Sequence, residues 1–111
     1  MLEKEKILRE NIEEYYNPGL MAFGEKKFNS ATTLFFKALA ALADLFILKK
    51  EGNVPSSHQK RFRVLENKYQ DIYQILDKDF PFYQDSYTKK MDKEAAEVLQ
   101  EDANKIKEMA Q

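Results

Sequence analysis

The sequence predicts an all-α fold, an up-and-down antiparallel four-helix bundle formed by a single domain, residues 1–111. Three observations predict it. Residues 31–48 form an almost continuous apolar block, interrupted only by Lys37 and Asp44. Glycine and proline are sparse, with three of each, and they fall between helix-like stretches. Apolar residues elsewhere recur at steps of three and four positions, which is the period of a helix with one buried face.

The first helix is expected from about Leu2 to Phe23. Its apolar residues at helical spacing are Leu8, Ile12, Tyr15, Tyr16, Leu20 and Phe23. Pro18 lacks the amide hydrogen that an α-helix uses, and Asn17 before it is a good helix N-cap. We therefore predict that this helix is interrupted near Pro18.

The second helix is expected from about Lys27 to Lys50. It should be the central helix, because nearly every side of it is apolar and must be covered. Two lysines in its last turn complement the helix dipole, and Gly52 can end it. A membrane span is disfavoured, since each of the two charged residues inside the block would cost about 2.5 to 3.5 kcal/mol at the bilayer centre.

The third and fourth helices are expected after this glycine turn. The third begins where Ser56 and Gln59 have capping-box spacing, and its core seam is Phe62, Leu65, Tyr69, Ile72 and Leu76. An aromatic connector, residues 80–87, should then fold back over the end of the bundle. The last helix should begin with Asp92 as its N-cap and bury Ala95, Leu99, Ala103 and Ile106.

Charge and composition limit the function classes. The net charge of -1 disfavours a general nucleic-acid binder, which normally has a strongly basic face. The absence of cysteine excludes disulfides, thiolate zinc sites and cysteine nucleophiles, and it suits a cytoplasmic protein. No metal or cofactor is predicted. Asp77, Asp79 and Asp85 have the spacing of a calcium loop, but Phe82 and Thr88 replace its glycine and its final glutamate.

Basic residues gather around the predicted turn between the second and third helices. We treat them as candidate phosphate- or nucleotide-binding residues, because cations at a helix N-terminus can hold a phosphate: Lys49, Lys50, His58, Lys60, Arg61 and Arg63. The alternative is a solvated helix end, since 33% of the chain is charged. The histidine also has two interpretations, a group that exchanges protons near neutral pH or a polar residue that ties down the preceding loop.

One face of the second helix is expected to bind a second copy of the chain. Four helices in a small bundle rarely cover a central helix on every side, and the residues left over after one buried face is assigned are Leu34, Phe36, Ala41, Ile47 and Leu48. We predict that these candidate interface residues form a homodimer with the two-fold symmetry usual for small oligomers.

Several short segments together resemble the HEPN superfamily (higher eukaryotes and prokaryotes nucleotide-binding). They are, in chain order, residues 24–31 (GEKKFNSA), 36–39 (FKAL), 43–45 (ADL) and the turn from Gly52 to His58. The resemblance spans about residues 10–110. It implies a helical bundle that dimerises, and many members of the superfamily are RNA-cleaving toxins or companions of a minimal nucleotidyltransferase.

The chain departs from this family at the ribonuclease motif. Active members carry an Arg followed after about four to six residues by a His, a pair that polarises the phosphate and transfers a proton. Here no arginine precedes His58 at that interval, and residues 79–92 contain neither residue type. We therefore expect a non-catalytic, dimeric protein-interaction or nucleotide/RNA-binding module, with a nucleotidyltransferase as candidate partner in a toxin–antitoxin-like system. The alternative is a divergent RNA- or nucleotide-acting enzyme that uses Tyr87 and Lys90.

Overall fold

A computed structural model describes residues 2–111 and contains five helices and no strand within that range. The helices are α1 (Leu2–Gly24), α2 (Phe28–Glu51), α3 (His58–Lys68), α4 (Gln70–Asp85) and α5 (Lys93–Ala110). The all-α prediction is confirmed. The predicted number of helices is not, because the third predicted helix is two helices in the structure.

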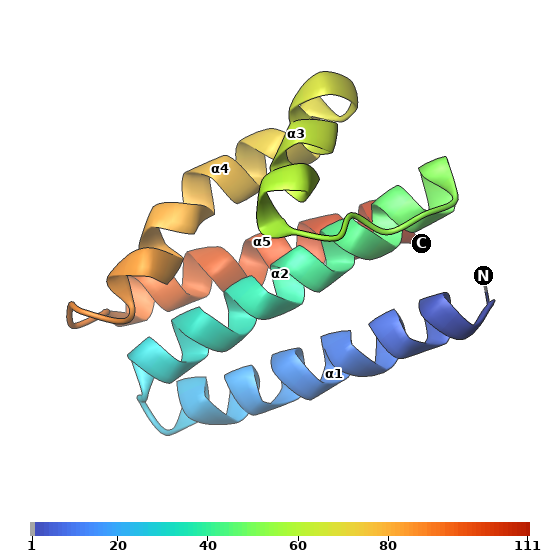
Figure 1. The fold of residues 1–111 in the computed structure, drawn as a ribbon. Helices are drawn as coiled ribbons and strands as arrows, with labels where there is room; N and C mark the ends of the chain where they lie inside the picture. The colour runs from blue at the N-terminus through green and yellow to red at the C-terminus, as the bar shows by residue number, and fades with distance from the viewer. Residues whose placement is uncertain (1) are drawn as a thin grey trace.

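The apolar helix α2 lies at the centre, and α1, α4 and α5 each pack against it (Figure 1). The helices α1 and α4 run antiparallel to α2, whereas α5 runs in the same direction. The predicted bounds of α2 are correct to one residue, and Gly52 ends it in the left-handed conformation, with φ of 85°. It is long and apolar enough to cross a membrane, but 72% of its most apolar window is buried inside the molecule, as expected for the core helix of a globular protein.

The core has the composition that the helical periodicity predicts. Leu65, Ile72 and Leu76 of the predicted seam are fully buried, as are Leu99 and Ile106 of α5. They pack in one cluster with the buried residues of α2. The seam is therefore correctly registered, although it is shared between α3 and α4.

The helix α1 is continuous through Pro18, so the predicted interruption is wrong. Proline at this position leaves the carbonyl of Glu14 without its helical amide partner. Both residues are exposed, so water can satisfy that carbonyl and the helix does not need to break. The next residue, Gly19, faces α2, where a Cβ atom would lie 2.8 Å from the ring of Phe35. The glycine therefore permits close approach of α1 and α2.

The predicted third helix breaks at Tyr69, whose backbone leaves the helical region with φ of -136° and ψ of 68°. Its ring packs edge-on against Phe46 with centroids 5.0 Å apart, and its hydroxyl donates to Glu51. These contacts with α2 compensate for the lost helical geometry. The helix α4 then continues through Pro81 to Asp85, so most of the predicted connector is helical.

Side chains cap the N-termini of α3 and α5. Ser57, rather than the predicted Ser56, caps α3 and accepts a hydrogen bond of 3.1 Å from the amide of Lys60. Asp92 caps α5 as predicted, accepting from the amide of Ala95 at 2.9 Å. The loop between α4 and α5 is fixed to α2 by Asn29, whose amide and carbonyl groups bond to the backbone of Ser86, Lys89 and Met91.

Candidate functional site

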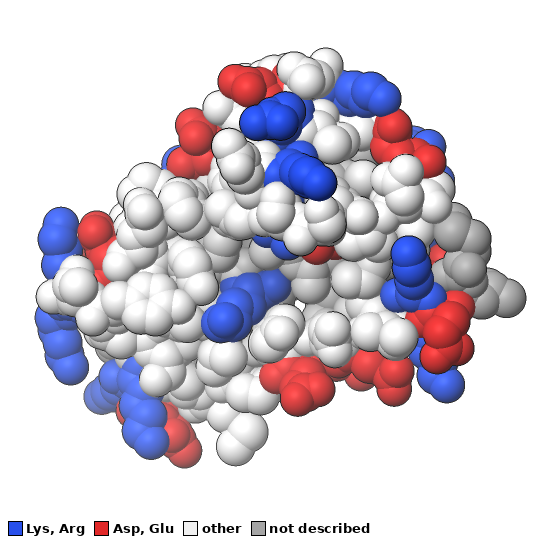
Figure 2. All heavy atoms as spheres, viewed as in Figure 1, with Lys and Arg blue, Asp and Glu red and all other residues white. Residues whose placement is uncertain are grey.

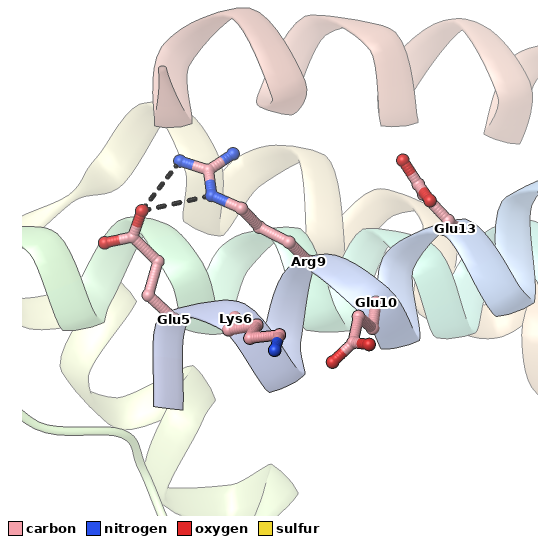
Figure 3. Close-up of a pocket in the computed structure, with 5 residues that line it drawn as sticks. All are labelled: Glu5, Lys6, Arg9, Glu10 and Glu13. Carbon is pink, nitrogen blue, oxygen red and sulfur yellow. Dashed lines mark hydrogen bonds and ion pairs between the residues drawn. The ribbon is translucent and has the colours of Figure 1, made fainter. Parts of the chain in front are cut away.

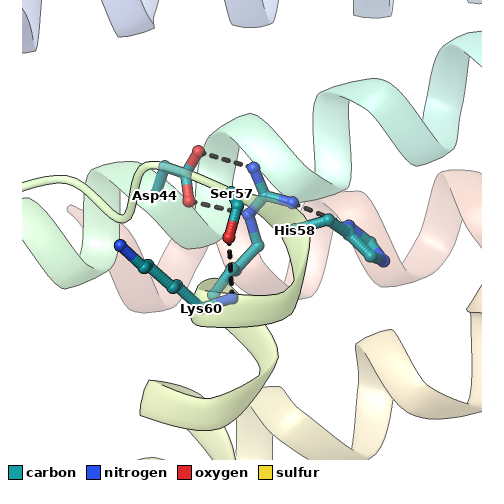
Figure 4. Close-up of polar contacts among 5 residues, drawn as sticks. Asp44, Ser57, His58 and Lys60 are labelled. Carbon is teal, nitrogen blue, oxygen red and sulfur yellow. Dashed lines mark hydrogen bonds and ion pairs between the residues drawn. The ribbon is translucent and has the colours of Figure 1, made fainter.

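The predicted basic region is organised around one buried ion pair between α2 and α3 (Figure 4). Arg61 donates two hydrogen bonds to Asp44, from Nε to Oδ1 at 2.7 Å and from Nη2 to Oδ2 at 2.9 Å. Its third nitrogen, Nη1, lies 2.9 Å from Nδ1 of His58. This planar fork-to-carboxylate geometry is the strong form of an arginine ion pair. It fastens the short helix α3 to the central helix.

His58 is partly buried and packs in an aromatic cluster. Its ring centroid is 4.6 Å from that of Phe80 and 4.7 Å from that of Phe62. Because Arg61 always donates, Nδ1 must accept, and the ring proton resides on Nε2, which is buried and has no partner among the described residues. Burial and the charge of Arg61 lower the pKa of His58, against a smaller opposing effect of Asp44. The neutral imidazole is therefore the stable form.

A proton titration tests this geometry directly, since His58 is the only histidine in the chain. We expect the imidazole to titrate below the usual value of 6.5, because burial disfavours the charged ring and protonation would place a cation against the guanidinium of Arg61. The measurement is the pH dependence of the imidazole carbon and nitrogen shifts by NMR. A midpoint at or above 6.5 would show that the ring is solvated and free of the arginine.

The six candidate phosphate-binding residues do not converge on one cavity. Arg61 is committed to Asp44, and the Nζ of Lys50 lies over the ring of Phe46 at 5.6 Å. The remaining cations, Lys49, Lys60 and Arg63, are exposed. Five cavities in residues 2–111 are lined by side chains other than these six. At this end of α2, the Arg61–Asp44 ion pair fastens α3 to α2, and exposed lysines surround it.

The face predicted for dimerisation is largely used by the chain itself. Phe36, Ala41, Ile47 and Leu48 are buried within the monomer, and only Leu34 of the five is partly accessible. The reason is local: Phe36 stacks on Tyr83 of α4 with centroids 4.7 Å apart, so α4 covers that side of the central helix. These four residues are therefore unavailable to a second chain unless the monomer opens.

A narrower part of α2 does remain accessible. Between residues 30 and 40 its partly or fully exposed side chains are Ser30, Thr33, Leu34, Lys37 and Ala40, which we call the open stripe. Tyr87 lies two residues beyond the end of α4, next to Ser86, whose hydroxyl hydrogen-bonds that of Thr33, and it is 65% exposed. Figure 2 shows this side of the molecule: uncharged side chains cover much of the left of the view, over α4 and the start of α2, and a basic side chain lies at the centre of the face.

Three of these five cavities bring together no set of side chains that forms a binding or catalytic site. A hollow of about 390 Å³ on α1 is lined by Glu5, Lys6, Arg9, Glu10 and Glu13, and Figure 3 shows that all five belong to one helix. Arg9 pairs with Glu5 there at 3.0 Å, as on any solvated helix face. A hollow of about 490 Å³ lies between Phe46, Tyr69, Ile72 and Met109, and one of about 270 Å³ between Lys26, Lys27 and Lys90.

A buried pair of carboxyl groups was not predicted. Asp79 of α4 and Asp102 of α5 are both buried, and Lys78 and Lys105 flank them at the surface. The sequence does hold a signal, since each aspartate occupies a core position of its helix. Asp79 follows Leu76 by three residues. Asp102 lies three residues after Leu99 and four before Ile106. An acidic residue in an apolar register indicates a buried polar contact.

The described residues contain no group of three or more His, Cys, Asp or Glu side chains placed to hold a metal ion. Comparison of the chain with protein-family models, curated proteins and solved structures gave no match. The resemblance to the HEPN superfamily therefore rests on the sequence pattern.

Proposed function

We propose that this chain is a non-catalytic protein-interaction module that forms a homodimer through the open stripe of α2. In this proposal the fold is a HEPN-like bundle of α1, α2, α4 and α5, to which α3 is added as a short clamped helix. We also expect a cytoplasmic location. The observation that carries the proposal is the accessible, nearly uncharged face of the central helix.

The composition of this face suits a protein interface. The centre of an interface is depleted in charged residues and enriched in aromatic ones. The open stripe carries one charge, Lys37, whose Nζ lies 6.0 Å above the ring of Tyr15 on α1. Tyr87 supplies an exposed aromatic side chain at the edge, where its hydroxyl hydrogen-bonds that of Tyr83 at 2.8 Å. Leu34 is the large apolar side chain of the stripe and is partly exposed.

The surroundings of His58 argue against catalysis. Acid–base catalysis at neutral pH needs a group whose proton moves easily in the presence of substrate. The ring of His58 is held by Arg61 and enclosed by Phe62 and Phe80. A partner with a nucleotidyltransferase fold, which the family resemblance suggests, would then supply chemistry that this chain lacks.

Sedimentation analysis tests the proposal. We expect the protein to be dimeric on the order of tens of micromolar, and Leu34→Asp to weaken the dimer by about tenfold or more, since a charge would enter the desolvated centre of the interface. The control is Ile7→Asp near the start of α1, which replaces an exposed isoleucine at the opposite end of the antiparallel α1–α2 pair from the stripe and should leave the dimer unchanged. Circular dichroism confirms that both variants remain folded.

A monomer at these concentrations, or equal effects of the two variants, would contradict the dimer. Incubation of the purified protein with RNA tests the non-catalytic assignment. Turnover of RNA that is abolished by Tyr87→Phe or Lys90→Ala, but not by Lys60→Ala, would instead favour the divergent enzyme.

A further inference from the structure

The helices α4 and α5 meet at the buried carboxyl pair. The side chain of Asp79 is fully buried and that of Asp102 almost so. Lys78 Nζ lies 3.0 Å from Oδ2 of Asp102 and 3.8 Å from Oδ1 of Asp79, and Lys105 Nζ lies 3.8 Å from Oδ1 of Asp102. Two acidic groups thus share one site with two partly solvated cations.

If both carboxyl groups are ionised, their buried oxygens lack hydrogen-bond donors. Neither oxygen of Asp79 accepts a hydrogen bond from any described residue, and Oδ2 of Asp102 also lacks a hydrogen-bond donor despite the nearby lysine. A buried ionised carboxylate without donors is strongly disfavoured. A single proton removes the conflict, since a protonated carboxyl can donate to a neighbouring carboxylate.

We propose that Asp79 and Asp102 hold one proton between them at neutral pH and form a proton-linked clasp that fastens α4 to α5. The proton resides on Asp79, because Asp102 is closer to both lysines and is the better-stabilised anion. This inference is independent of the proposed dimer. A proton, rather than a metal ion, is the natural occupant, since the two flanking ammonium groups repel cations.

The electrostatics of the surrounding helices agree with this assignment. Burial and the neighbouring Asp102 raise the pKa of Asp79 to about 8, against the opposing charges of Lys78 and Lys105. Burial also acts to raise the pKa of Asp102, but a hydrogen bond from the proton on Asp79 and the close ammonium group of Lys78 outweigh it and leave that pKa below its usual value. On α2, Asp44 is bound by Arg61 and Lys37 lies over Tyr15, so neither neutralises the pair. Glu101 of α5 helps Asp102 and Asp79 to raise the pKa of Lys78.

The sign of the pH dependence follows from proton linkage. Between 3.8 and about 8 the folded chain holds a proton that the unfolded chain releases, so stability falls as the pH rises through this range. The depressed pKa of His58 acts in the opposite direction below 6.5, where the unfolded chain takes up the extra proton. The histidine contribution is half gone at pH 6.5 and small above about 7.5, so the fall in stability between about 7 and 8 comes mainly from the carboxyl pair.

Urea unfolding across this interval tests the clasp. We expect the folding equilibrium constant of the wild type to fall by up to about tenfold per pH unit between about 7 and 8 and to level off beyond about 9. Asp79→Asn should remove this slope, because the amide donates to Asp102 without titrating, and it should make the protein more stable than the wild type above about 8. The control is Asp77→Asn, an exposed aspartate of the same helix, which should keep the wild-type slope.

Carboxyl-carbon NMR of the wild type gives a result that does not depend on whether a variant folds. We expect one aspartate to remain protonated at pH 6.5 and to titrate near 8. Amide hydrogen exchange in α4 should accelerate as this group ionises, beyond the ordinary base catalysis seen in α1. A wild-type slope retained in Asp79→Asn, ionised shifts for every aspartate at pH 6.5, or stabilisation of the wild type by magnesium would each overturn the clasp.

Discussion

Replacing Arg61 with methionine is expected to lower the free energy of unfolding by about 3 to 5 kcal/mol, the cost of leaving one partner of a buried ion pair alone. The side chains of Arg61 and Asp44 are only 15% and 9% exposed. The substitution would strand a carboxylate that now accepts two charge-assisted hydrogen bonds, and it would remove the contact with His58. Urea unfolding followed by circular dichroism measures the effect.

Two variants separate the ion pair from ordinary surface electrostatics. Lys68→Met breaks the 2.9 Å pair with Glu51, in which the lysine is 58% exposed, and should cost only about 0 to 1 kcal/mol. The double variant Arg61→Met with Asp44→Leu should recover much of the loss, because it leaves no buried charge unpaired. Similar losses for Arg61→Met and Lys68→Met would show that Asp44 is hydrated and that the clamp on α3 is weak.

Local sequence was sufficient to predict most of the helices. The end of α2 followed from Gly52, and the start of α5 followed from Asp92, because a cap or a glycine acts within one helical turn. The expected breaks at the prolines did not occur, because the effect of a proline depends on its surroundings in the folded molecule. A helix can continue through a proline where water reaches the carbonyl that the proline leaves free, and the exposure of Pro18 and Pro81 is a property of the folded molecule.

The candidate sites were harder to predict because they depend on residues far apart in the sequence. Asp44 and Arg61 are separated by 17 positions and meet only when α3 turns back over α2. The basic residues around Arg61 therefore looked like an anion site until its partner was known. The same limit applies to Phe36, which seemed free for a dimer because nothing local indicates that Tyr83 covers it.

The second large effect is expected from Ile72→Ala, at about 2 to 5 kcal/mol, because truncation loses the transfer free energy of the side chain and leaves a cavity. Ile72 is 1% exposed and lies in the core cluster at the start of α4. It also borders the hollow of about 490 Å³ beside Met109. The flexible, partly exposed methionine can move toward the vacated space, so the loss should fall in the lower half of this range.

Leu99→Ala provides the enclosed comparison. Leu99 is fully buried, borders none of the five described cavities, and should lose more stability than Ile72 on truncation. Ile7→Ala on α1 removes the same atoms as Ile72→Ala from a side chain that is 47% exposed, and should cost about 0.5 kcal/mol or less. Urea unfolding ranks the three variants. Equal losses for Ile72→Ala and Ile7→Ala would mean that the start of α4 is solvated, and the break at Tyr69 would then be a loose hinge rather than a packed corner.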